Sequence, residues 1–171
     1  LVVAAYVAYV FLDYHRIPDN TPLEIRNLTE QLEPAQVGEE YRAVTYNVGF
    51  GAYTPEFTFF MDGGKSSWAH SEESVIASIQ GAAQTVQQLD ADLILLQEID
   101  LDATRSYHVS QEELFDAAFA GYCSSLAIDY DSPFLFYPFT QPHGKSLAAL
   151  GLYSRLPITS ALRRSLPISE G

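Results

Sequence analysis

The chain has 171 residues with 22 acidic and 9 basic side chains, so its net charge is −13. This charge disfavours binding to DNA, because proteins hold a polyanion mainly through Lys and Arg contacts to its phosphates. The length suffices for one domain with a sizeable core. The single cysteine, Cys123, excludes an internal disulfide framework and is expected to be a small buried apolar residue.

The first twelve residues, LVVAAYVAYVFL, carry no charge. Twelve apolar residues are too few to span a bilayer, which needs about twenty. The tyrosines at 6, 9 and 14 suit the aromatic belt of a membrane interface. We therefore predict that residues 1–16 are part of a membrane anchor or leader, which implies an extracytoplasmic domain at a bacterial cell surface. A buried N-terminal helix or strand is the alternative.

Residues 17–40 are polar and contain three prolines, so they are predicted to form a linker. A core strand follows at 42–48. Ser71 is a good N-cap for a helix whose apolar residues recur every three or four positions: Val75, Ile79, Ala82, Val86 and Leu89. A buried strand is expected at 92–97. This strand–helix–strand order indicates an α/β fold, with helices packed on a sheet.

A capping box at 110–113 predicts a second helix with its buried face at Phe115, Ala118, Tyr122 and Leu126. Further strands are expected at 134–139 and 148–153, joined by a loop. Residues 159–166 are predicted to form another strand or a sheet edge.

Two strands end in residues that could bind a hard cation. The first, Thr45–Gly49, offers the amide oxygen of Asn47, and the second, Asp92–Glu98, offers the carboxylate of Glu98. If the strands lie side by side, both oxygens meet at one edge of a sheet, where a metal could polarise a phosphate. We predict that Asn47 and Glu98 are ligands of a divalent metal ion at this edge. The alternative for Glu98 is a carboxylate that simply emerges into solvent.

A third segment, Gly151–Ile158 (GLYSRLPI), completes a pattern with the two strand ends. In order and wording the three resemble the endonuclease/exonuclease/phosphatase superfamily, the fold of pancreatic deoxyribonuclease, bacterial sphingomyelinase and the inositol polyphosphate phosphatases. The resemblance implies a four-layer α/β/β/α sandwich, of which residues 41–171 would be the N-terminal portion. It also implies metal-dependent hydrolysis of a phosphate ester, with Asn47 and Glu98 as catalytic residues that hold Mg²⁺, and with Mn²⁺ or Ca²⁺ as alternative ions.

Other motifs of that superfamily are missing from these 171 residues. The asparagines are at 20, 27 and 47, none of them in an Asp-x-Asn sequence, and no Asp-His pair occurs. We interpret the chain as an internal fragment that holds the first half of the domain, and we expect little hydrolysis from it alone.

Two basic residues are candidates for binding substrate phosphate, namely Arg105 and Lys65. The fork of Arg105 suits two phosphate oxygens, although an ion pair with Asp100 or Asp102 is an equal alternative. Lys65 follows two glycines, but it belongs to no P-loop, because Phe59 occupies a required glycine position. His143 does not align with the catalytic histidine of the superfamily, and it is assigned no role.

The sequence therefore predicts a membrane-anchored, metal-dependent phosphoester hydrolase of the phosphodiesterase or phosphatase type, with a small or lipid-borne phosphate ester as substrate. A nuclease on the same fold is the first alternative, and nucleic acid is the less favoured partner because of the acidic charge. A truncated, non-catalytic binding module is the second alternative.

Overall fold

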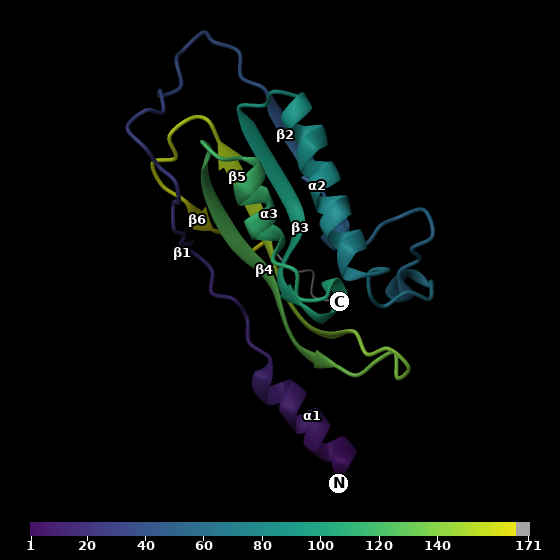
Figure 1. Ribbon diagram of the computed structural model, residues 1–171. Coiled ribbons are helices and arrows are strands. Elements are labelled where there is room, and N and C mark those ends of the chain that lie inside the picture. The colour runs from purple at the N-terminus through teal and green to yellow at the C-terminus, as the bar shows by residue number, and fades with distance from the viewer. Residues whose placement is uncertain (167–171) are drawn as a thin grey trace.

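The computed structural model describes residues 1–166. Its centre is a four-stranded sheet (Figure 1), in which the strands lie in the order β2 (Ala43–Asn47), β3 (Leu93–Ala103), β5 (Gly144–Ser154) and β4 (Cys123–Leu135). Strands β2 and β3 are parallel, and the other neighbours are antiparallel. A second, two-stranded sheet pairs β1 (Thr21–Pro22) with β6 (Leu162–Arg163). The chain thus has the mixed α/β fold that was predicted.

Two helices, α2 (Glu72–Gln88) and α3 (Gln111–Ala118), cover one face of the sheet (Figure 1). Helix α2 begins as the sequence predicts, because the Ser71 hydroxyl accepts a hydrogen bond from the Ser74 amide. Its apolar stripe is buried at Val75, Ile79, Ala82, Ala83 and Val86. Leu89, which was expected to continue this stripe, follows the helix and is exposed.

The core lies between these helices and the sheet, where alternate residues of β3, such as Ile94 and Leu96, are buried. On the opposite face of the sheet, Leu95 and Leu150 are exposed. Residues 1–166 therefore contain one four-stranded sheet with one helical layer, together with the small β1–β6 sheet. Helices and sheet fix the position of every strand end discussed below.

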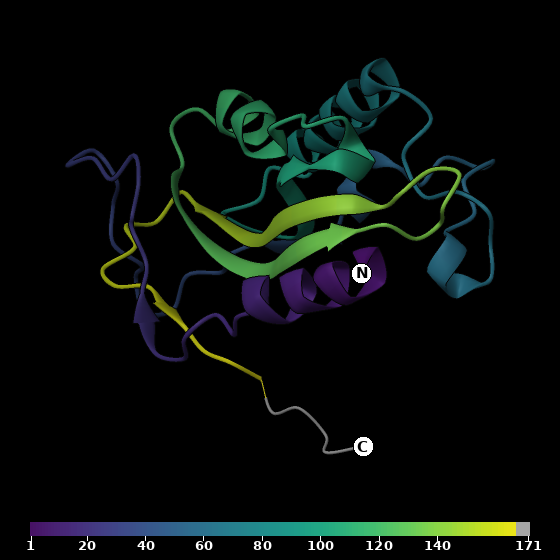
Figure 2. The same ribbon diagram turned by 90° about the horizontal axis from the view of Figure 1, so that it is seen from below.

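The N-terminal helix α1 (Val2–Asp13) lies on the side of β4 opposite to α2 and α3 (Figure 2). The Tyr6 hydroxyl donates to the Phe134 carbonyl and accepts from the Phe136 amide, while the Tyr9 hydroxyl accepts from the Phe134 amide. The helix predicted at the N-terminus is therefore present, and it contacts the end of β4. None of the helices in residues 1–166 has the length and apolar character needed to cross a bilayer.

Two predicted elements have different bounds in the structure. The second helix was expected to reach Leu126, but it ends at Ala118, and Gly121 turns the chain with φ +96° before β4 begins at Cys123. The prediction of a strand at 134–139 was also wrong, since β4 ends at Leu135. Pro138 has no amide hydrogen to continue the ladder, so residues 136–143 form the connection to β5.

Replacing Ile79 with Ala should lower the free energy of unfolding by about 2–5 kcal/mol, because a fully buried side chain leaves a cavity between α2 and the sheet. Urea denaturation followed by circular dichroism measures the change. Gln84→Ala on the exposed face of the same helix is the control. An equal, small effect in both variants would contradict the packing described for α2.

Candidate functional site

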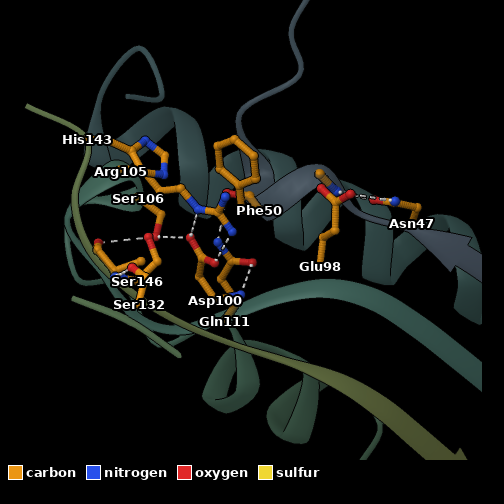
Figure 3. A network of polar contacts seen from close by, with 12 residues as sticks. Asn47, Phe50, Glu98, Asp100, Arg105, Ser106, Gln111, Ser132, His143 and Ser146 are labelled. Carbon is orange, nitrogen blue, oxygen red and sulfur yellow. Dashed lines mark hydrogen bonds and ion pairs between the residues drawn. The ribbon is translucent and has the colours of Figure 1, made fainter. Parts of the chain in front are cut away.

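The parallel pairing of β2 and β3 brings the two predicted ligands together. Asn47 lies opposite Gln97 in the register, one residue before Glu98. The Asn47 Nδ2 atom donates a hydrogen bond of 2.8 Å to Glu98 Oε1, and the two side chains point toward each other (Figure 3). The two side chains thus meet at one sheet edge as predicted, but Asn47 directs its amide nitrogen to Glu98, whereas the prediction was that the amide oxygen would lie beside the carboxylate.

A β-bulge directs Glu98 toward Asn47. The pairing of β3 with β5 shifts register between Leu96 and Ile99, and Glu98 has φ +58°. A non-glycine residue in this left-handed region costs of the order of 1–3 kcal/mol and persists only where the surrounding structure enforces it. The neighbouring Gln97 is fixed by hydrogen bonds from its Nε2 atom to Thr45 Oγ1 and the Leu95 carbonyl.

The turn after β2 holds Asn47 from the other side. The Asn47 Oδ1 atom accepts a hydrogen bond of 2.9 Å from the Gly49 amide, at the start of the 3₁₀ helix η1 (Gly49–Gly51). Gly49 has φ +54°, and a Cβ atom there would lie 2.5 Å from Cδ2 of Tyr53. The close contact and the backbone angle together favour glycine at this position.

The free carboxylate oxygen of Glu98 suits a hard cation. Glu98 Oε2 has no hydrogen-bond partner in residues 1–166, and both side chains line a depression of about 380 Å³. Within the same residues, no group of three or more His, Cys, Asp or Glu side chains could hold a metal. Glu98 Oε2 thus fits one oxygen ligand of a divalent cation, while Asn47 holds the carboxylate in place. A single protein ligand is compatible with Mg²⁺, because this ion usually keeps several waters.

Arg105 forms the buried ion pair that was one of its two predicted roles. Its Nε and Nη2 atoms donate to the Asp100 carboxylate at 3.0 and 2.8 Å, and its guanidinium lies 3.9 Å from the centre of the Phe50 ring. Ser106 Oγ donates to the same carboxylate, while the Gln111 side chain accepts from the Asp100 amide (Figure 3).

The remaining nitrogen of the Arg105 guanidinium, Nη1, has no hydrogen-bond partner in the part of the chain that the structure describes. Arg105 lines a cavity of about 390 Å³, and Glu98 and Tyr53 line both this cavity and the depression at Asn47. The phosphate contact predicted for Arg105 is therefore compatible with its ion pair to Asp100.

The structure does not bring Lys65 to this site. Lys65 is exposed and lines a different depression, together with Glu56 and Trp68. Its loop folds back on itself, with the Lys65 amide donating to the Thr58 carbonyl at 2.9 Å.

His143 was assigned no role from the sequence, yet the structure buries it in the wall of the cavity that Arg105 and Glu98 line. Its Nδ1 atom lies 3.3 Å from the Ser67 carbonyl, so the neutral ring donates there and leaves Nε2 as an acceptor. Burial lowers the pKa of His143, and the charge of Arg105 lowers it further. Since Ser67 is 76 residues away, no local sequence signal could have identified this histidine.

Acidic side chains outnumber basic ones around the cavity, which Asp62, Glu98, Asp129 and Arg105 line. Burial raises the pKa of Tyr53, and the carboxylates of Glu98 and Asp62 add to the effect. Partial desolvation raises the pKa of Asp129, which also lines the cavity, and the charge of Glu98 raises it further. A bound cation would offset this accumulation of negative charge.

Comparison with known protein families gives the geometry its context. The model of the Endonuclease/Exonuclease/phosphatase family matches residues 44–170. The chain belongs to this family. Members of the Endonuclease/Exonuclease/phosphatase family are hydrolases of the phosphoesterase and nuclease type, and the matched range contains Asn47, Glu98 and Arg105. Comparison with curated proteins and with solved structures found no match.

Replacing Asp100 with Asn should lower the free energy of unfolding by about 3–5 kcal/mol, because the buried guanidinium of Arg105 loses the charge that compensates it. Asp102→Asn, two positions along the same strand, is the matched control. Its side chain is exposed, so we expect a change within about 0.5 kcal/mol. Chemical denaturation measures both variants, and a mild effect of Asp100→Asn would contradict a structural role for the ion pair.

The lowered pKa of His143 predicts a pH dependence of stability. Protonation of His143 is disfavoured in the folded protein, so its contribution to the free energy of unfolding is constant above its ordinary pKa of 6.5. It falls as the pH drops below that value, until the lower pKa of the folded state is reached. Between about pH 7.5 and about pH 5.5 the loss should be up to about 1 kcal/mol. Urea denaturation at both values should show a smaller loss for His143→Gln than for the parent protein, and equal losses would refute the prediction.

Proposed function

We propose that this chain carries the metal-binding and phosphate-binding part of a metal-dependent phosphoester hydrolase, of the phosphodiesterase or phosphatase type. One observation carries the proposal: the hydrogen bond between Asn47 and Glu98 at the neighbouring ends of two parallel strands. In a family of hydrolases, an oriented carboxylate with one free oxygen at a sheet edge suits a divalent cation.

Asn47 positions the carboxylate for this task. Its Nδ2 atom holds Glu98 Oε1, which leaves Oε2 as the oxygen directed to the ion, and its own Oδ1 atom is fixed by the Gly49 amide. Partners of this kind orient a metal ligand, and their removal typically lowers metal affinity or activity by roughly 10- to 100-fold. Mg²⁺ is the proposed ion, with Mn²⁺ or Ca²⁺ as alternatives, and when bound it would polarise the phosphate and stabilise the leaving oxygen.

Arg105 is the proposed phosphate ligand. Asp100 fixes two of its nitrogens, so the guanidinium is oriented in advance and offers Nη1 to a phosphate oxygen. Its place in the same cavity as Glu98 allows one phosphate group to contact both Arg105 and the ion. Lys65 lies outside this cavity and is left out of the proposal.

The charge of the cavity favours a small or lipid-borne phosphate ester over a nucleic acid. Three carboxylates line it, those of Asp62, Glu98 and Asp129, against the single Arg105. A polyanion needs a row of basic side chains along its backbone, so a nuclease is the less favoured alternative. We also propose that α1, which is uncharged over residues 1–12, anchors the domain to a membrane. The domain would then lie outside the cytoplasm, at a bacterial cell surface.

Glu98→Gln should abolish binding of a divalent cation while leaving the fold unchanged, because it removes the charge and keeps the shape. Mn²⁺ titration followed by NMR measures this directly. In the parent protein we expect paramagnetic broadening of the amides at 47–49 and 97–98, which the variant should lack. Asn47→Ala should weaken binding by roughly 10- to 100-fold.

Glu40→Gln, an exposed acid outside the site, is the control and should bind Mn²⁺ like the parent protein. Hydrolysis of phospholipid, inositol phosphates and nucleic acid is then assayed with the full-length protein in the presence of Mg²⁺. Broadening that is centred elsewhere in the parent protein, or that persists in Glu98→Gln, would remove these two residues from the mechanism.

A further inference from the structure

The connection between β4 and β5 exposes aromatic side chains. Phe136, Tyr137 and Phe139 are 50%, 63% and 85% exposed, and we call these three residues the aromatic tip. Scattered exposed apolar residues are ordinary on protein surfaces, but three large rings within four residues form a cluster typical of an interaction site.

Helix α1 lies against the same hairpin. The ring of Tyr6 makes an edge contact with Phe136 at 5.0 Å between centroids, and the tyrosine hydroxyls bind the backbone of residues 134 and 136. Helix α1 has no buried residues. Its exposed apolar side chains include Val3, Val7, Phe11 and Leu12. The aromatic tip and α1 are therefore attached to each other, and both expose apolar groups.

Charge identifies the partner that suits these two elements. Neither residues 1–12 nor residues 133–142 contain a charged side chain, although the chain has 22 acidic residues. A basic protein partner would be attracted to the acidic surfaces instead, and anionic lipid would repel a chain of net charge −13. The headgroup and acyl boundary of a zwitterionic bilayer accepts uncharged aromatic and aliphatic groups.

Aromatic contacts connect the tip to the cavity of the proposed active site. Tyr137 packs on Phe60 at 5.8 Å, and Phe60 packs on His143 at 5.5 Å. His143 lines the cavity, as does the exposed Met61. The cavity therefore lies next to the base of the tip.

We propose that the aromatic tip inserts into the interface of a zwitterionic phospholipid bilayer beside α1, so that the neighbouring cavity lies at the level of the lipid phosphates. Two elements hold the domain in one orientation, whereas a single helix would leave it free to rotate. Insertion of the tip stands apart from catalysis, and only delivery of a lipid phosphate to the cavity rests on the proposed function.

Sedimentation of the full chain with phosphatidylcholine vesicles tests the insertion without metal or hydrolysis. Tyr137→Ser combined with Phe139→Ser should lower the partition coefficient about tenfold, because two exposed rings no longer leave water. Val37→Ser is the matched control, since Val37 is fully exposed outside both elements, and it should bind like the parent protein. Unchanged partitioning of the double variant overturns the proposal.

A fluorescent label gives an independent measurement. Cys123 is fully buried, so a Phe139→Cys variant carries one accessible thiol for an environment-sensitive dye. Insertion predicts a blue shift with phosphatidylcholine vesicles. No shift, or a shift only with phosphatidylglycerol, overturns the proposal. Self-association without vesicles that the double variant abolishes also overturns it, because the tip would then join copies of the chain. Vesicle binding by a chain that shows no Mn²⁺ broadening of the amides at 47–49 and 97–98 would leave the insertion standing and count against the proposed function alone.

Discussion

The buried charge pair of Asp100 and Arg105 organises the centre of the molecule. Both residues come from one short stretch of chain, yet their contacts extend beyond the neighbouring Ser106 to two other elements, through Gln111 of α3 and Phe50 of η1. A carboxylate without solvent exposure is tolerable only when it is fully compensated, and here the guanidinium of Arg105 and the hydroxyl of Ser106 meet that need. The same contacts hold η1 and β3, the two elements on which Asn47 and Glu98 depend.

The local pattern of the sequence was enough to predict the parts of the site that lie at strand ends. Asn47 and Glu98 each follow a run of β-forming residues, and parallel pairing converts that arrangement into a contact. The bulge at Glu98 was beyond such reasoning, because it depends on how β3 pairs with β5 across the sheet. The same holds for His143, whose environment comes from rings and a carbonyl far away in the chain.

Helix α2 was predicted well because its cap and its apolar period agree with each other. The later elements were predicted less well, since Tyr122 and Leu126 fit a helical period as easily as they fit a turn and a strand. In the structure Gly121 turns the chain with a positive φ angle, and β4 begins two residues later. The run of aromatic residues at 134–139 has high strand propensity, but such propensity depends on having a neighbouring surface to pack on. Only its first two residues remain in β4.

Strand β4 is the outermost strand of the sheet, and both of its ends are covered. The backbone of Arg26 pairs with Ser124 at one end, while the hydroxyls of Tyr6 and Tyr9 occupy the amide and carbonyl groups near Phe134 at the other. An uncovered border strand is a template for unwanted pairing with a second chain. Through the hydroxyls of Tyr6 and Tyr9, the N-terminal helix thereby leaves fewer backbone groups at this end of β4 free to pair with a second chain.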